Sequence, residues 1–310
     1  MIRSVDRTSS SVAPVAGARV HVPTLRSRRV MRNSDVPISV RIIEQADIKQ
    51  HRHDFTEIVV VLGGVGDHLL DDDRFPISTG DVLVIDQNHV HGYRNARGLQ
   101  IANILFDEQF VLDREHSLTH LAGYQALVHL EPGARSRLSF GGKLKLTTEN
   151  RIMIEERIHE LRDELTTRAE GYQALSLSIL VDVIVRLCRI YRTSASDTQR
   201  NLCDMGYVVG YLEQNYQDRI EIKDLEPLVA MSPRTLMRRF AQATGTTPMQ
   251  YLLRVRVTRA AHMLCTTQAS MTDISAEVGF SDSNYFSRQF RKLIGTSPTE
   301  YRHAYTSSHA

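Results

Sequence analysis

The 310-residue sequence is short of cysteine and has no long hydrophobic run, and each deficit excludes a class of protein. Its three cysteines, Cys188, Cys203 and Cys265, are odd in number and lack CxxC spacing, which excludes a disulfide framework and a zinc finger. The longest apolar runs, such as residues 58–62, are too short to cross a bilayer, and the N-terminus lacks the apolar core of a secretory signal. We therefore expect a cytoplasmic protein with reduced thiols and no membrane association.

The composition is that of a soluble globular protein, with 42% hydrophobic and 24% charged residues. The length is about twice that of a usual domain and predicts two domains. Residues 1–36 show no strand or helix periodicity, so we predict a flexible N-terminal segment there.

The segment that follows is rich in short β-type stretches separated by turn residues, which predicts a small barrel or sandwich. We expect strands at residues 38–43, 57–62, 68–70, 81–85 and 99–106. Residues 149–192 change to a helical period, and two helices there are equally suited to the core and to a dimer interface. Polar residues 193–206 predict an interdomain linker.

The last hundred residues contain an internal repeat. Gly-Thr-Thr-Pro-x-x-Tyr, which begins at Gly245, recurs as Gly-Thr-Ser-Pro-x-x-Tyr at Gly295, 50 residues later. Each copy has the capping residues and breaks of two helices joined by a tight turn, the geometry of a helix-turn-helix unit. Residues 231–302 carry a net charge of +6, as contact with DNA phosphates requires.

The stretch from about Tyr207 to Arg302 resembles the DNA-binding domain of the AraC/XylS family of transcriptional regulators. The matching residues are Ser232-Pro-Arg-Thr-Leu236, Phe240, Gly245, Pro248, Tyr251, Arg256, Ala260, Leu264, Ile274, Gly279-Phe-Ser-Asp-Ser-Asn-Tyr-Phe286, Phe290, Gly295, Pro298 and Tyr301-Arg302. The resemblance implies two helix-turn-helix units joined by one helix, here at about Met249 to Thr266, with double-stranded DNA and RNA polymerase as partners. We predict this all-α domain over residues 207–304.

Once the side chains expected to point inward are set aside, helical spacing identifies the residues that face the DNA groove. In the second unit we expect Tyr285, Phe286, Phe290 and Leu293 to point inward. By resemblance the groove-facing positions carry the base contacts in the family, and here they are Arg234, Met237, Arg238, Ser283, Asn284, Ser287 and Arg288.

Four residues of the barrel segment have side chains that can bind metal ions or sugar hydroxyls: His51, His53, Glu57 and His91. Residues two apart on a strand project to the same side, so His51 and His53 share a face. The spacing looks like the two motifs of the cupin fold, in which these positions bind metal in the enzymes. Gln45 replaces the opening glycine of the first motif, and Asp86 and Asn88 replace the proline and glycine of the second. The pattern therefore indicates the fold more specifically than it indicates a metal.

Regulators of the AraC/XylS family use this barrel as a sugar-binding pocket, usually without metal. The resemblance implies that His51, His53, Glu57 and His91 bind an effector with no cofactor, and Arg41 is a further pocket candidate. Residues 40–106 and the sequence Asp282-Ser-Asn-Tyr-Phe-Ser287 look most like the rhamnose-operon activators of the family. L-rhamnose is therefore the leading effector.

These features predict an α+β two-domain protein: a cupin-like β-barrel with following helices, then an all-α double helix-turn-helix domain. Residues 37–192 would form the effector-binding and dimerisation domain of a homodimer. The predicted function is a non-enzymatic, effector-responsive transcriptional regulator, an activator of sugar catabolism genes. Two alternatives stay open: a metal-dependent cupin enzyme fused to a DNA-binding module, and a repressor whose barrel only dimerises. The sequence shows no nucleophile–base pair that would favour the enzyme.

Overall fold

The computed structural model describes residues 23–31, 35–137, 143–193 and 196–309, and most of the predicted flexible segment lies outside these ranges. Within the described part, β1 (Thr24–Leu25) pairs in parallel with β3 (Ile48–His53), and helix α1 (Ser27–Val30) follows. The backbone amide of Ser27 donates to the Asp54 carboxylate over 2.5 Å. These contacts hold residues 23–31 against strand β3 and the loop that follows it. The prediction of a flexible segment over residues 1–36 is therefore wrong for residues 23–31.

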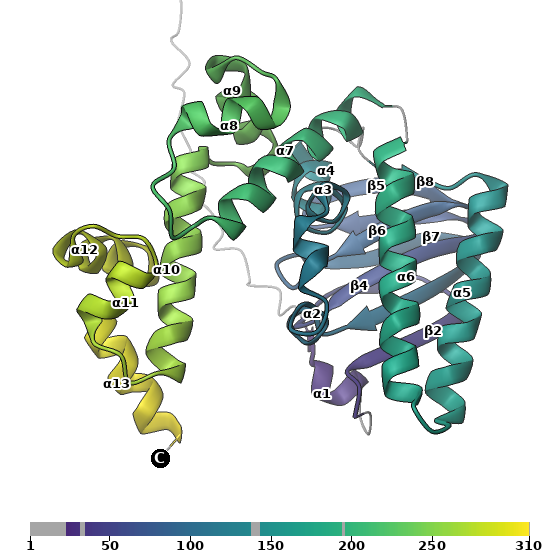
Figure 1. Ribbon diagram of the computed structural model, residues 1–310. Helices are drawn as coiled ribbons and strands as arrows, with labels where there is room; N and C mark the ends of the chain where they lie inside the picture. Colours follow the sequence, from purple (N-terminus) through teal and green to yellow (C-terminus); the bar gives the residue numbers. More distant parts are fainter. Residues whose placement is uncertain (1–22, 32–34, 138–142, 194–195, 310) are drawn as a thin grey trace, which may run out of the picture.

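The β-rich domain predicted from the sequence is confirmed (Figure 1). Its described strands form one eight-stranded sheet in the order β1-β3-β7-β4-β6-β8, with β2 paired to β7 and β5 paired to β4. We call this sheet the barrel. The strands after β1 and β3 are β2 (Ile38–Glu44), β4 (Thr56–Leu70), β5 (Asp73–Ser78), β6 (Asp81–Ile85), β7 (His91–Phe106) and β8 (Leu144–Lys145).

The long strands β4 and β7 bend where two glycines meet. Gly64 has a φ of +74° and Gly98 a φ of +54°, and the pairing register shifts between Val61 and Val65. A Cβ on Gly64 would lie 2.1 Å from the Gly98 carbonyl oxygen, so this position requires glycine. The sequence pattern indicated a strand break here. The structure instead continues β4 through a bulge, because glycine lets the strand bend without ending.

Helical segments cover one side of the barrel (Figure 1). The chain after β7 forms α2 (Glu108–Leu112), a 3-10 helix η1 (His116–His120), α3 (Ala122–Tyr124), a π-helical segment η2 (Gln125–Leu130) and α4 (Glu131–Arg137). Two long helices then follow, α5 (Thr148–Thr167) and α6 (Tyr172–Thr193), and α5 packs on β2. Ile158 and Leu161 of α5 are fully buried, so the inner face of this helix is core.

Helix α7 (Asp197–Gln214) occupies most of the range predicted as a linker. Ser196 caps it, since its hydroxyl accepts from the amide of Gln199 over 3.1 Å. Leu202 and Met205 are buried, and α7 packs against α3 and η2. The structure therefore corrects the linker over residues 197–206. A polar Ser-Asp sequence there begins a helix instead of separating two domains.

The predicted double helix-turn-helix domain is present. Its helices are α8 (Ile222–Val229), α9 (Pro233–Thr244), α10 (Pro248–Thr266), α11 (Met271–Glu277), α12 (Ser283–Ile294) and α13 (Pro298–His309). The connecting helix α10 begins one residue before the predicted Met249 and ends at the predicted Thr266. Ser232 caps α9, and Gly245 ends it in the left-handed conformation with a φ of +73°.

The two helix-turn-helix units differ in what they pack on. Leu236 and Phe240 of α9 belong to one continuous core with α7 and the helices of the barrel domain. Phe286 and Phe290 of α12 form a separate core with α10 and α11. Figure 1 shows α11, α12 and α13 on the side of α10 that faces away from the barrel. Among the described residues, no helix is both long enough and apolar enough to cross a membrane.

Candidate effector pocket and DNA-binding helices

The first predicted recognition helix, α9, exposes all three of its predicted base-reading residues, Arg234, Met237 and Arg238. On the opposite side Leu236 and Phe240 are fully buried, and α9 packs against α7 and α4. A helix with one anchored side and one cationic exposed side has the form that enters a major groove.

The second predicted recognition helix, α12, exposes Asn284 and Arg288, whereas Ser283 and Ser287 are half-buried. The Ser287 hydroxyl donates to the Ser283 carbonyl over 2.9 Å, so this donor is used within the helix. The Arg288 guanidinium lies 5.9 Å from the ring centroid of Tyr285, a cation–π contact at the helix surface. Arg288 and Asn284 are therefore the most accessible of the four.

Two side chains of α12 do not lie where the sequence pattern predicted. Tyr285 and Leu293 were expected to point inward, but they are 43% and 39% exposed. Phe286 and Phe290 alone fill the core of this unit from α12, and both are fully buried. The inward face of α12 is thus narrower than predicted and consists of two aromatic rings one turn apart, whose centroids lie 5.7 Å from each other.

A cavity of about 160 Å³ opens in the barrel, and all five predicted effector-binding residues line it. His51 and His53 lie on β3, Glu57 on β4 and His91 on β7. These four side chains are at least 91% buried, whereas Arg41 on β2 is exposed. The structure therefore brings together, in one pocket, residues up to 50 positions apart in the sequence.

The hydrogen bonds of His53 determine which of its nitrogen atoms faces the cavity. Nδ1 lies 2.7 Å from the Phe55 carbonyl oxygen, so Nδ1 donates to this oxygen and Nε2 is the nitrogen on the pocket side. The Glu57 Oε2 atom lies 3.3 Å from this Nε2 and 3.4 Å from the Nε2 of His91. Two imidazoles and a carboxylate thus converge on one point in the pocket floor.

Burial shifts the pKa values of two pocket residues, His91 and Tyr93. It lowers the pKa of His91 well below the usual value, and the neighbouring His68 and His51 lower it further when they are charged. Burial also raises the pKa of Tyr93 well above its usual value, and the nearby Glu57 carboxylate adds to this effect. At neutral pH His91 is therefore a neutral imidazole and Tyr93 keeps its phenolic proton. Such groups suit an uncharged ligand that both donates and accepts hydrogen bonds.

Four residues of the pocket occupy the positions that bind metal in cupin enzymes, and three of these four lie close enough together to bind one metal ion. His53, Glu57 and His91 each offer a ligand atom within 4.8 Å of the others. The bond from His53 Nδ1 to a backbone carbonyl is the outer contact that orients metal-binding imidazoles. His51 lies outside this group, although its ring centroid is 4.4 Å from that of His91.

The pocket contains polar groups that the sequence analysis missed. Tyr93 and Asn103 line it, and the Tyr93 hydroxyl and Asn103 Oδ1 have no hydrogen-bond partner among the described residues. Both lie an even number of positions from His91 on β7, so strand alternation could have identified them. No sequence signal pointed to Leu25 and Val30, which line the pocket from the N-terminal segment.

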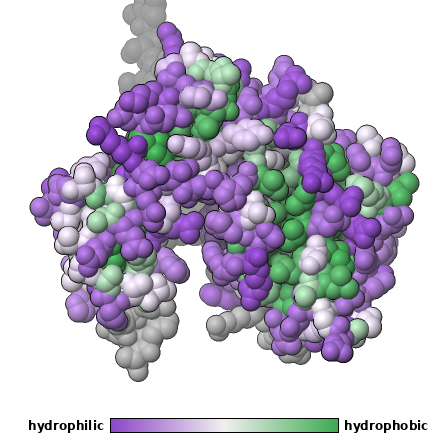
Figure 2. All heavy atoms as spheres, in the orientation of Figure 1, coloured by the Kyte–Doolittle hydropathy of each residue, from purple (hydrophilic) through white to green (hydrophobic). Residues whose placement is uncertain are grey.

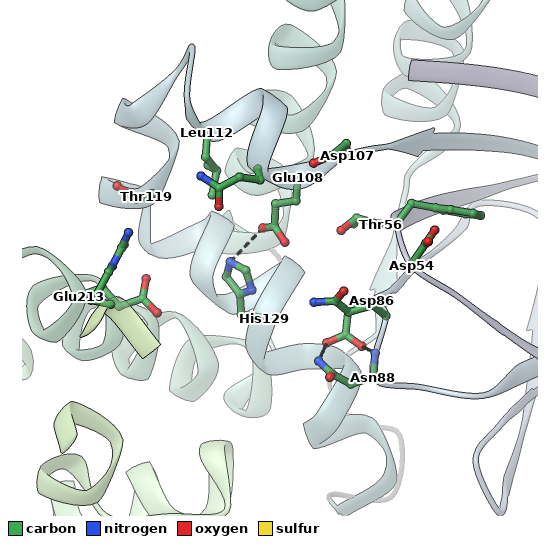
Figure 3. A pocket seen from close by; sticks show the side chains of 14 residues that line it. Asp54, Thr56, Asp86, Asn88, Asp107, Glu108, Leu112, Thr119, His129 and Glu213 are labelled. Carbon is green, nitrogen blue, oxygen red and sulfur yellow. Dashed lines mark hydrogen bonds and ion pairs between the residues drawn. The ribbon is translucent and has the colours of Figure 1, made fainter. Parts of the chain in front are cut away.

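A second cavity, of about 360 Å³, lies between the barrel domain and helices α7 and α10 (Figure 3). Its lining is mostly polar and includes five acidic residues, with Arg259 contributed by α10. His129 Nε2 lies 3.2 Å from Glu108 Oε1. Burial acts to lower the pKa of His129, but the hydrogen bond and the attraction of Glu108 outweigh it and raise this pKa. The Glu213 carboxylate accepts from the Tyr251 hydroxyl over 2.6 Å, so this cavity is a polar junction in which several acidic groups have hydrogen-bond partners.

A barrel with a polar cavity, joined to two helix-turn-helix units with exposed cationic faces, defines an effector-responsive transcriptional regulator that binds DNA. Residues 38–178 match the family model of the AraC-like ligand binding domain, and residues 228–304 match that of a helix-turn-helix domain. The chain belongs to the AraC family, and the resemblance found in the sequence is confirmed.

Curated relatives span most of the chain. The HTH-type transcriptional activator RhaS of Pectobacterium carotovorum is 28% identical over 260 residues, which cover 84% of this chain and 89% of that protein. The activator RhaR of Mannheimia succiniciproducens is 28% identical over 271 residues, 87% of this chain and 93% of that protein. Among solved structures, the DNA-binding domain of AdpA in complex with a target DNA is 30% identical. The match covers 34% of this chain and 95% of the AdpA chain, with a TM-score of 0.33.

Proposed function

We propose that this protein activates genes of sugar catabolism when its barrel binds a monosaccharide, with L-rhamnose as the leading effector. The observation that carries the proposal is a set of polar atoms around the pocket with no hydrogen-bond partner among the described residues: His53 Nε2, both ring nitrogens of His91, the Tyr93 hydroxyl and Asn103 Oδ1. An unpartnered buried polar group costs about 1–3 kcal/mol, so a ligand with several hydroxyls gains affinity by pairing with them. The relatives RhaS and RhaR are activators, which supports activation.

Each predicted effector-binding residue has a role in this proposal. Glu57 accepts hydrogen bonds from two sugar hydroxyls, and the imidazoles of His51, His53 and His91 accept or donate one each. Arg41, at the exposed rim, donates to a ring hydroxyl. The barrel senses its ligand and does not transform it.

The Glu57→Gln variant tests the pocket. It preserves side-chain size and removes the charge, and hydrogen bonds to charged groups contribute about 1.5–3 kcal/mol. We expect the affinity for L-rhamnose to fall about tenfold or more in calorimetric titration, with loss of sugar-dependent transcription. Operator affinity without sugar should stay unchanged. The matched control is Glu156→Gln, at an exposed position on α5, which should alter neither property.

The full-length protein is needed for this test, because a fragment that begins at residue 205 would cut α7. Normal L-rhamnose binding by Glu57→Gln would exclude this cavity as the effector site.

The seven exposed and half-buried residues of α9 and α12 are proposed to read bases. Arg234, Arg238 and Arg288 can bind guanine, Asn284 can bind adenine, and Met237 can contact a thymine methyl group. Ser283 and Ser287 lie beside them and contribute through their remaining hydrogen-bonding capacity.

Arg288 and Lys292 should respond differently to truncation. A bidentate arginine–guanine contact contributes about 1–3 kcal/mol of discrimination, whereas a phosphate contact weakens all sequences alike. We expect Arg288→Ala to relax preference at one operator position and Lys292→Ala mainly to reduce the salt dependence of binding. Titration of single-base operator variants at two salt concentrations measures both. Equal weakening of every variant by Arg288→Ala would contradict the placement of α12 in the groove.

A second candidate function, metal-dependent chemistry, is favoured by the His53, Glu57 and His91 group. These residues would hold a divalent ion, which would polarise a ligand oxygen. Elemental analysis of the purified protein, followed by a thermal-shift screen of monosaccharides, separates the candidates. Stoichiometric metal with turnover of a small substrate favours an enzyme, and stabilisation by a sugar favours the sensor. A barrel that binds neither and only dimerises favours a repressor.

We propose that the protein acts at a promoter in the cytoplasm and has two further partners. These are RNA polymerase, which an activator must recruit, and a second copy of the chain. Homodimerisation is supported by apolar side chains that gather over α6 (Figure 2), where Leu175 is 46% exposed, and by Ile152 on α5, which is 48% exposed. Leu161 is excluded from such an interface because it is buried within the protomer.

A further inference from the structure

The effector pocket has two chemically different zones. The floor is polar and closed, since His53, Glu57 and His91 are exposed by only 2%, 4% and 1%. The mouth is apolar and open, since Ile43 and Ile48 are exposed by 40% and 42% although both line the cavity. A residue that both lines a cavity and contacts solvent marks its entrance.

The N-terminal segment supplies the rest of this apolar mouth. Leu25 and Val30 line the cavity, and Leu25 is 37% exposed. Parallel pairing of β1 with β3 places Leu25 opposite His53. We define the methyl collar as Leu25, Val30, Ile43 and Ile48. Leu25, Ile43 and Ile48 are exposed and Val30 is half-buried, so this opening has an apolar surface that a ligand of matching polarity would cover.

We infer that the methyl collar reads the C6 methyl group of a 6-deoxyhexose and so selects it over the corresponding hexose. The inference rests on the proposed sugar-sensing function. The hydroxyls of such a sugar lie on one part of the ring and the methyl group on another. Only an orientation with the hydroxyls at the floor satisfies the unpartnered polar atoms there. The methyl group then lies at the collar.

The selectivity has two physical sources. Covering one methyl group contributes roughly a fourfold change in Kd. In the corresponding hexose a hydroxymethyl group replaces the methyl group and places a hydroxyl among aliphatic side chains. An apolar site disfavours such a hydroxyl by at most about a hundredfold in affinity. Arg41, which is exposed and also lines the cavity, offers such a hydroxyl a partner, so the preference is finite.

Three sugars test the collar, because they differ in a single substituent. L-rhamnose carries a methyl group at C5, L-mannose a hydroxymethyl group and L-lyxose a hydrogen atom. Calorimetric titration of the full-length protein should show the tightest binding for L-rhamnose, with Kd values about four- to a hundredfold higher for the other two. Ile48→Thr, which keeps a β-branched side chain on β3 and adds a hydroxyl, should reduce the L-mannose to L-rhamnose ratio of Kd values.

The matched control is Val65→Thr, on β4, 47% exposed and outside the pocket lining, which should leave the ratio unchanged. Ile43→Thr tests the same collar from β2 if Ile48→Thr does not fold. Equal affinity for the three sugars overturns the collar but leaves sugar sensing in place. Tighter binding of L-lyxose than of L-rhamnose also overturns it, since the mouth would then exclude the methyl group. Binding of none of them overturns the proposed effector itself.

Discussion

Replacement of Arg135 by methionine is expected to destabilise the protein by about 3–5 kcal/mol. Arg135 is 1% exposed and forms a two-point ion pair with the equally buried Glu131, one turn earlier in α4. Its guanidinium also donates to the Val84 carbonyl of β6 over 3.3 Å. Removal of one partner leaves a buried carboxylate without its counter-charge, which is the most costly way to break such a pair.

The double variant Arg135→Met with Glu131→Leu separates charge from packing. Because replacing a whole buried ion pair by apolar residues is often neutral, the second change should recover most of the lost stability. Arg157→Met is the control, since the Arg157–Glu160 pair is 43% and 46% exposed and such pairs contribute about 0–1 kcal/mol. Urea unfolding followed by circular dichroism measures all three. Equal losses for Arg135→Met and Arg157→Met would refute the argument.

The second large effect is expected at Gly206, where α7 crosses the barrel domain. A Cβ at this position would lie 2.4 Å from the carbonyl oxygen of Ala122 in α3. In an open helix the change from glycine to alanine stabilises by about 1 kcal/mol. Here Gly206→Ala has to move α7 away from α3, and overpacking of this kind costs about 1–3 kcal/mol.

Gly210→Ala, one turn later in the same helix, is the matched control. Its nearest atom would be the Thr119 carbonyl oxygen at 3.2 Å, a contact that a small shift relieves. We expect Gly206→Ala to lower the unfolding free energy and to speed hydrogen exchange in α3, η2 and α7, with a much smaller effect of Gly210→Ala. If Gly206→Ala were as stable as Gly210→Ala, the close approach of the two helices would not hold the domains together.

The DNA-binding domain was the part most fully predictable from sequence. Its helix ends depend on local residues, such as Ser232 as a cap and Gly245 and Gly295 in the left-handed conformation, and these act over four or five residues. The repeat then indicated the positions of both predicted recognition helices. Tyr285 was wrongly predicted to point inward, because helical spacing identifies which side of a helix is buried but not how many residues around the helix that buried side includes.

The pocket in the barrel was predictable in part. The alternation of strand residues placed His51 and His53 on one face, and the cupin-like spacing added Glu57 and His91. Leu25 could not have been found, because its place at the mouth depends on the parallel pairing of β1 with β3, and two-residue strands leave no periodic signal.

The sequence by itself determined the architecture, the family and five of the residues that line the barrel pocket, because caps, periodicity and motif spacing are local properties of the chain. Tertiary structure decided the rest. It made α7 a shared helix where composition indicated a linker, since Leu202 and Met205 become buried only against α3 and η2. Such burial depends on which distant surfaces meet, and a linear pattern of residues does not specify that.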